Sequence, residues 1–243
     1  KRVLKKEATC WLNLGDTYSG MKIGDTNGTY ADWEDKSKVY AKTDSFKKLP
    51  ISGLKSKNLI GIPWRVAFAL QATGWILRQD IIWAKPNPMP ESVKDRCTKS
   101  HEYIFLFSKS QNYYFNNEAI KEKSTQNGKP HPTGQKISPD RNDTDMAGKT
   151  IGDGITRNKR SVWTISTKPF KDAHFATFPE DLIAPMILAG CPSAGIVLDI
   201  FMGSGTTAVV AKKLKRQWLG IELNEKYVEM SNQRIKSTPT PLL

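Results

Sequence analysis

Apolar residues along this chain gather in short runs, and polar stretches of very different length separate them. Runs of strand length that are mostly apolar occupy residues 8–15, 75–84, 102–108, 196–201 and 218–223. Apolar positions at helical spacing occur from Pro63 to about Gly74, around residues 182–187, from Gly205 to about Lys215, and after Asn224. Strands that alternate with helices in this way predict an α/β domain.

Two long segments, residues 19–58 and 121–160, are polar and contain few large apolar side chains. Segments of this composition cannot bury enough apolar surface to fold alone. We therefore expect a single domain over residues 1–243, with a loop at 19–58 and a variable insert at 121–160. The proline-rich stretch at 85–90 is predicted to be a loop that joins two strands of the sheet.

The most informative stretch begins at residue 196. An apolar strand ends near Phe201, a glycine-rich turn (GSGTT, residues 203–207) follows, and a helix then leads to the strand at 218–223. Asn224 is placed to cap the last helix. Strand, turn, helix and strand make a βαβ unit, which implies a mostly parallel sheet covered by helices.

The glycine turn has the composition of a nucleotide-type site. Glycines let the backbone approach a ligand closely, and the helix that follows offers unpaired N–H groups. Glu222 ends the next strand, 19 residues beyond Gly203. Because the ends of adjacent parallel strands are neighbours, Glu222 is expected to reach a ribose and to accept hydrogen bonds from both of its hydroxyls.

Three readings of this turn compete. A P-loop requires a lysine before the Ser/Thr, and Thr206-Thr207 has none, so phosphate transfer is disfavoured. A dinucleotide site fits Gly203, Gly205 and Ala208, but it requires a second mononucleotide half, and only about 20 residues follow Glu222. The strands upstream must then complete the sheet, and a glycine turn near the end of the fold suits a site for S-adenosylmethionine, where no pyrophosphate has to be held. A tight turn without a ligand remains as a further alternative.

The charge balance points to a polyanionic partner. Lysine and arginine number 37 against 24 acids, a formal net charge of +13, and nucleic acid is the commonest partner of so basic a chain. Three scattered cysteines and three histidines show no metal-ligand spacing. No run approaches 18 consecutive apolar residues, so we expect a cytoplasmic protein without a membrane span or a metal.

Residues 199–207 (DIFMGSGTT) resemble the D-P-F-x-G-S-G-T-T signature of the bacterial and phage DNA amino-methyltransferases, the N6-adenine and N4-cytosine family. Residues 220–224 with Tyr227 are similar to its G-I-E-x-x-x-x-Y segment. Residues 174–179 (HFATFP), 12–18 and 83–90 with His101-Glu102 resemble further blocks of the family. The order is that of the permuted subgroup, in which the signature for S-adenosylmethionine (SAM) comes last.

The resemblance implies a Rossmann-like SAM-methyltransferase fold with a mostly parallel sheet, an antiparallel hairpin and helices on both faces. It implies SAM as cofactor and double-stranded DNA as substrate, as in restriction–modification, and its chemistry requires no metal. The SAM-binding residues that it implies are Asp199, Phe201, Gly203, Ser204, Gly205, Thr206, Thr207, Glu222, Asn224, His174, Phe175 and Phe178. The residues expected near the flipped base are Asn87, Pro88 and Arg96, and the insert at 121–160 is either a surface loop or a DNA contact.

Two departures from the family pattern matter. Ile200 stands where the family has proline, which affects the rigidity of the turn more than its contacts. The catalytic block, Asp/Asn/Ser-Pro-Pro-aromatic, occurs nowhere in the chain, so the catalytic residues and the choice between adenine and cytosine stay open. We expect a missing N-terminal segment. The alternatives are an incomplete SAM- or DNA-binding subunit that needs an N-terminal piece or a homodimer, and a methyltransferase acting on RNA or protein.

Overall fold

The computed structural model describes residues 1–19, 54–124, 156–168 and 177–239. These ranges hold the predicted strands and helices, and most of the two polar segments lies outside them. Within the described ranges, no helix combines the length and the apolar character that a membrane crossing requires.

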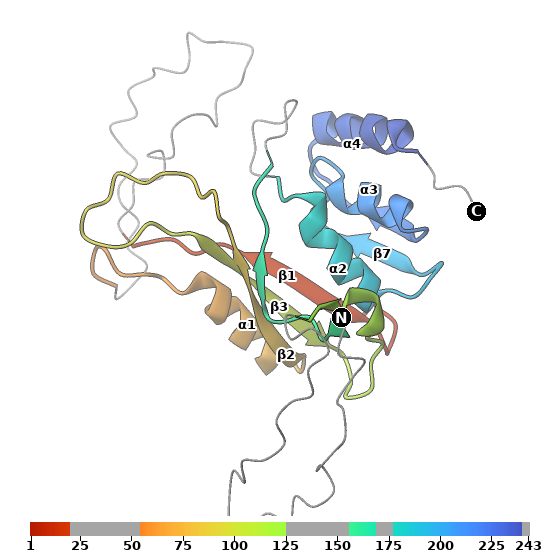
Figure 1. The fold of residues 1–243 in the computed structure, drawn as a ribbon, viewed down its shortest axis with the longest axis horizontal. Helices are drawn as coiled ribbons and strands as arrows, with labels where there is room; N and C mark the ends of the chain where they lie inside the picture. Colours follow the sequence, from red (N-terminus) through yellow and green to blue (C-terminus); the bar gives the residue numbers. More distant parts are fainter. Residues whose placement is uncertain (20–53, 125–155, 169–176, 240–243) are drawn as a thin grey trace, which may run out of the picture.

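Four strands form a mixed sheet in the order β1-β3-β2-β6 (Figure 1). They are β1 (Thr9–Leu14), β2 (Ile76–Ala84), β3 (His101–Ser108) and β6 (Val162–Thr164). β3 pairs antiparallel with both β1 and β2, whereas β6 runs parallel to β2. β1, β2 and β6 therefore point the same way, and their carboxyl ends lie at one edge of the sheet.

A second, parallel pair consists of β7 (Ile196–Asp199) and β8 (Gln217–Gly220), joined by helix α3 (Thr206–Lys213). This is the βαβ unit that the sequence predicts, so the α/β fold with an antiparallel hairpin is confirmed. More of the described sheet is antiparallel than the hydrophobic pattern of the sequence indicates, because β3 lies between β1 and β2 and runs antiparallel to both. β6 is too short to show in the hydrophobic pattern.

Helices cover both faces of the four-stranded sheet, as the sequence analysis predicted. Alternate residues of a strand point to opposite faces. Phe105 and Phe107 of β3 pack with Ala67 of helix α1 (Ile62–Ala72) on one face. Ile104 packs with Leu182 of helix α2 (Glu180–Gly190) on the other. The period of two along β3 thus builds two separate apolar layers.

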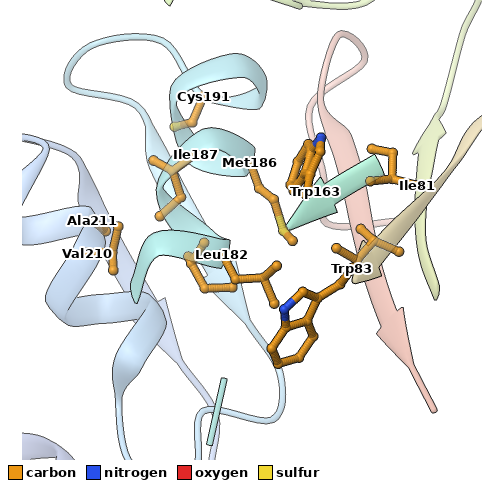
Figure 2. Packing of buried hydrophobic residues seen from close by; sticks show 11 residues of the cluster. Ile81, Trp83, Trp163, Leu182, Met186, Ile187, Cys191, Val210 and Ala211 are labelled. Carbon is orange, nitrogen blue, oxygen red and sulfur yellow. The ribbon is translucent and has the colours of Figure 1, made fainter. Parts of the chain in front are cut away.

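Helix α2 joins the sheet to the βαβ unit. Figure 2 shows Leu182 and Met186 of α2 beside Trp83 of β2, with Val210 of α3 on the far side of the helix. The indole N–H of Trp83 donates to the carbonyl of Ile165 (2.8 Å), so this large side chain is buried without an unpaired polar group. The apolar cluster therefore sets the distance between the sheet and the glycine turn that precedes α3.

The two polar segments, 19–58 and 121–160, are joined to the described structure at different places. Just beyond the carboxyl end of β1, the Ser19 amide donates to the Asn58 carbonyl (2.7 Å) and the Lys57 amide donates back to Ser19 (2.9 Å). The other segment begins and ends at an antiparallel pair, β4 (Glu122–Lys123) with β5 (Thr156–Arg157), on the amino side of β6; the short 3-10 helix η2 (Glu118–Ile120) precedes it. Segment 19–58 therefore begins and ends beside the carboxyl end of β1, whereas segment 121–160 does not.

The last helix, α4 (Glu225–Ser237), begins where the sequence predicts. Asn224 has an extended backbone (φ −89°, ψ 114°), and its side-chain oxygen accepts from the Lys226 amide at 3.0 Å. The helix buries Ser231 and Ile235. Asn224 thus satisfies one of the unpaired amides at the helix start.

Replacing Asn224 by alanine should lower the free energy of unfolding by about 1 kcal/mol, the typical cost of a lost N-cap. Urea denaturation of the chain measures this change. Asn224→Asp is the matched control, because it keeps the accepting oxygen and should stay close to the wild type. A similar loss for both variants would show that the cap is not the cause.

Candidate functional site

The glycine turn between β7 and α3 has two glycines in the left-handed region, Gly203 (φ 51°) and Gly205 (φ 81°). A Cβ on Gly205 would lie 2.8 Å from the Cβ of Ser231 in α4. A Cβ on Gly203 would meet nothing closer than the Phe201 carbonyl, at 3.9 Å. Gly205 therefore faces protein, whereas Gly203 faces the open side from which a ligand can approach.

Glu222 lies against this turn, as the parallel strand pair predicts. One of its oxygens accepts from the Gly203 amide (2.8 Å), and the other accepts from the Leu223 (3.0 Å) and Asn224 (2.9 Å) amides. These backbone bonds, with that of Asn224 the strongest, hold the pKa of the Glu222 carboxyl below its usual 4.5. Glu222 is therefore a fixed negative charge at neutral pH.

Asp199 spans the first part of the turn. One carboxylate oxygen accepts from the Phe201 amide (3.0 Å), and the other accepts from the Thr207 hydroxyl (2.6 Å). Ile200, where the family signature has proline, is about half exposed and packs into no core cluster. The carboxylate thus shapes the backbone that proline would otherwise restrain.

Ser204 and Thr206 are buried, and their hydroxyls point away from solvent. Both oxygens accept from the guanidinium of Arg234 in α4, at 3.3 Å and 2.9 Å. The predicted set therefore divides into two groups. Gly203, Phe201 and Glu222 border the open side, whereas these two hydroxyls hold the turn to the protein behind it.

Two residues of the site, Arg234 and Leu223, escaped the sequence analysis. Arg234 looks like an ordinary charge on a helix face, and only its contacts show that it supports the turn. Leu223 is 98% exposed and Phe201 is 82% exposed, at the carboxyl ends of the two parallel strands. Exposed apolar side chains grouped beside a polar site are typical of ligand contacts. An apolar residue directly after the acid that is expected to bind a ribose was the signal that could have found Leu223.

The remaining predicted residues have mixed outcomes. Phe178 is partly buried and packs against the apolar cluster around Leu182 and Met186, called the α2 cluster below. His174 and Phe175 lie outside the described residues. The side-chain amide of Asn87 pairs with the backbone of Thr167. Its Nδ2 donates to the Thr167 carbonyl (3.1 Å), and its Oδ1 accepts from the Thr167 backbone amide (2.9 Å). These bonds tie the loop after β2 to the loop after β6. A contact of Asn87 with a base stays a prediction.

Arg96 also has protein partners. Its guanidinium binds both carboxylate oxygens of Glu91 (2.8 and 3.2 Å) and lies 4.2 Å from the ring centroid of Tyr18. Pro88 follows Asn87 in the same loop, and a contact of Pro88 or Arg96 with a base stays a prediction. Searched over the described ranges, His, Cys, Asp and Glu form no group of three or more that could hold a metal ion.

The comparisons with known proteins agree with this geometry. A family model described as DNA methylase (N6/N4 methyltransferases) matches residues 1–233. The type II methyltransferase M.Cfr9I of Citrobacter freundii is 43% identical over 243 residues, all of this chain and 70% of the relative. The type II methyltransferase M.SmaI of Serratia marcescens is 46% identical over 236 residues, 97% of this chain and 70% of the relative.

Two solved structures share the fold. The PvuII DNA methyltransferase (cytosine-N4-specific) has a TM-score of 0.54 at 20% identity, over 76% of this chain and 59% of that one. A putative DNA modification methylase of Thermus thermophilus, complexed with S-adenosyl-L-methionine, has a TM-score of 0.56 at 18% identity, over 98% of this chain and 73% of that one. With the match of the family model to residues 1–233, these findings show that the chain belongs to the N6/N4 DNA methylase family.

Proposed function

We propose that this chain binds SAM at the glycine turn and takes part in transferring its methyl group to the exocyclic amino group of adenine (N6) or cytosine (N4) in double-stranded DNA. One observation carries the proposal: the charged carboxylate of Glu222 accepts from the Gly203 amide beside the open side of the turn. Family membership supplies the reaction class. The proposed compartment is the cytoplasm, where bacterial DNA lies.

The residues at the turn fit the cofactor. The Glu222 carboxylate has about four lone-pair sites, and three backbone amides use three of them, which leaves about one for a ribose hydroxyl. From the sequence, Glu222 was expected to accept hydrogen bonds from both ribose hydroxyls. Phe201 and Leu223 offer exposed apolar surface for the adenine ring. The segment that ends at Phe178 is proposed to hold the methionine part.

SAM, when bound, supplies a methyl group on a sulfonium. The chain contributes by holding the cofactor in one orientation, so that catalysis depends mainly on positioning. A target base must leave the DNA stack before its amino group can be reached. The groups that would accept hydrogen bonds from that amino group belong to the Asp/Asn/Ser-Pro-Pro-aromatic block, which these 243 residues do not contain.

We propose that residues not included in these 243 supply this block. Among the described strands, β1 has a hydrogen-bonded neighbour on one side only, and so does β7. Trp11 of β1 and Val197 of β7 nevertheless pack against the same α2 cluster. Two open strand edges under one helix favour a further strand between them.

The test is to incubate the chain with methyl-labelled SAM and unmethylated DNA, with and without the segment of M.SmaI that lies outside its match to this chain, added as a separate polypeptide. The digested DNA is then searched for N6-methyladenine and N4-methylcytosine. Label that requires the added segment supports the proposal and identifies the base. Label without it would place the catalytic groups within these 243 residues. RNA in place of DNA is the control for substrate class, and absence of SAM binding would refute the proposed function.

A further inference from the structure

Arg234 of α4 connects three parts of the fold behind the glycine turn. Its Nη1 atom donates to the Ser204 carbonyl (3.3 Å), the Ser204 hydroxyl (3.3 Å) and the Thr206 hydroxyl (2.9 Å). The side chain is only 20% exposed. One guanidinium therefore holds the backbone and both hydroxyls in the second half of the turn.

The same guanidinium also reaches the start of α2. Its Nη2 atom lies 3.6 Å from one carboxylate oxygen of Glu180, and the other oxygen accepts from Lys213 of α3 at 2.6 Å. Glu180 is the first residue of α2 and follows directly on residues 177–179, the end of the HFATFP segment. The Arg234 side chain thus contacts both the glycine turn and the helix entered from that segment.

We propose that Arg234 is a positioning residue that holds the two halves of the cofactor site, the glycine turn and residues 177–179 at the start of α2, at a fixed separation. This inference rests on the proposed function, in which one SAM molecule spans both halves. Arginine suits the task because its planar fork donates in fixed directions to several acceptors at once. The Glu180 carboxylate balances the charge, and its link to Lys213 adds a second connection to α3.

Two variants separate charge from geometry. Arg234→Lys keeps the positive charge, but a single ammonium cannot reproduce the directed bonds to Ser204, Thr206 and Glu180 together. Glu180→Gln leaves the bonds between Arg234 and the turn in place and weakens the links from α2 to Arg234 and to Lys213 of α3. If Arg234 holds the two halves of the cofactor site together, both variants should weaken the binding of ligands that span the two halves more than the binding of ligands that occupy one.

The experiment uses the 243-residue chain and measures calorimetric Kd values for two probes. S-adenosylhomocysteine carries both the adenosine and the amino-acid part, whereas methylthioadenosine carries only the adenosine part. Arg234→Lys should weaken binding of the first by about tenfold, as expected for lost charge-assisted hydrogen bonds, and binding of the second by less than about threefold. Glu180→Gln should show the same bias, and it tests the proposal even if Arg234→Lys folds poorly.

Arg216 provides the matched control. Its guanidinium donates to the carbonyls of Cys191 and Leu214, at the ends of α2 and α3 and away from the turn. Arg216→Lys should lower the Tm without changing the ratio of the two Kd values. If Arg234→Lys and Glu180→Gln weaken the binding of both probes equally, or of neither, the proposed positioning role of Arg234 is overturned. Failure of the wild-type chain to bind either probe would overturn the proposed function instead.

Discussion

Replacing Glu222 by alanine should weaken the binding of SAM by roughly 10- to 150-fold, the effect of losing one hydrogen bond to a charged acceptor in a ligand site. The carboxylate is held by three backbone amides, so in the wild type it needs no rearrangement to meet a ribose hydroxyl. Calorimetric titration with SAM measures the loss. The freed amides lie where water can reach them, so the Tm should change by only a few degrees.

The pH dependence of SAM binding gives a second test of Glu222. Backbone hydrogen bonds lower the pKa of this carboxyl below 4.5, so the charged form persists at neutral and mildly acidic pH. Its contribution is complete above the usual pKa and is lost only as the pH falls through the lowered one. Affinity should therefore show no transition from Glu222 between about pH 8 and pH 5.

Glu222→Gln is the matched variant for both measurements. It keeps the size of the side chain and removes the charge, so its affinity should lie between those of the wild type and of Glu222→Ala. A transition near about pH 6 in the wild type that disappears in Glu222→Gln would contradict the lowered pKa.

Gly205→Ala should destabilise the fold by about 2–5 kcal/mol, the sum of a backbone cost and a packing cost. The left-handed backbone of Gly205 (φ 81°) costs an L-residue about 1–2 kcal/mol. The new Cβ would also lie 2.8 Å from the Cβ and 3.2 Å from the Cα of Ser231, and overpacking of this kind costs about 1–3 kcal/mol. Because α4 must move, Arg234 should lose its hold on the turn, and SAM binding should fall with stability. Urea denaturation measures the first effect and calorimetry the second.

Gly203→Ala is the control in the same turn. Its backbone is also left-handed (φ 51°), but its Cβ would point into open space, so only the backbone cost of about 1–2 kcal/mol is expected. Ser231→Gly in the Gly205→Ala background should restore part of the lost stability, because the two side chains would otherwise collide. Equal losses for the two alanine variants, without rescue, would show that α4 does not pack on Gly205 as described.

Local rules determined much of this protein from its sequence. Apolar periods placed β1, β2, β3 and the helices, because such patterns depend on which residues share a face within a few positions. The cap at Asn224 follows from the preference of a short polar side chain for a helix start. The contact between Glu222 and Gly203 followed from one general rule, that adjacent parallel strands end side by side.

Only the tertiary structure decided how these parts meet. β6 is a short strand, and its strand character comes from pairing with β2, for example Ile82 with Val162, far away in the sequence. The side chain of Asn87 exchanges hydrogen bonds with the backbone of Thr167, 80 residues away, and no local pattern indicates this pairing. Arg234 is 28 residues from Thr206 and gains its role only when α4 packs behind the turn. Such contacts depend on the packing of distant elements, which no local pattern of apolar and polar positions encodes.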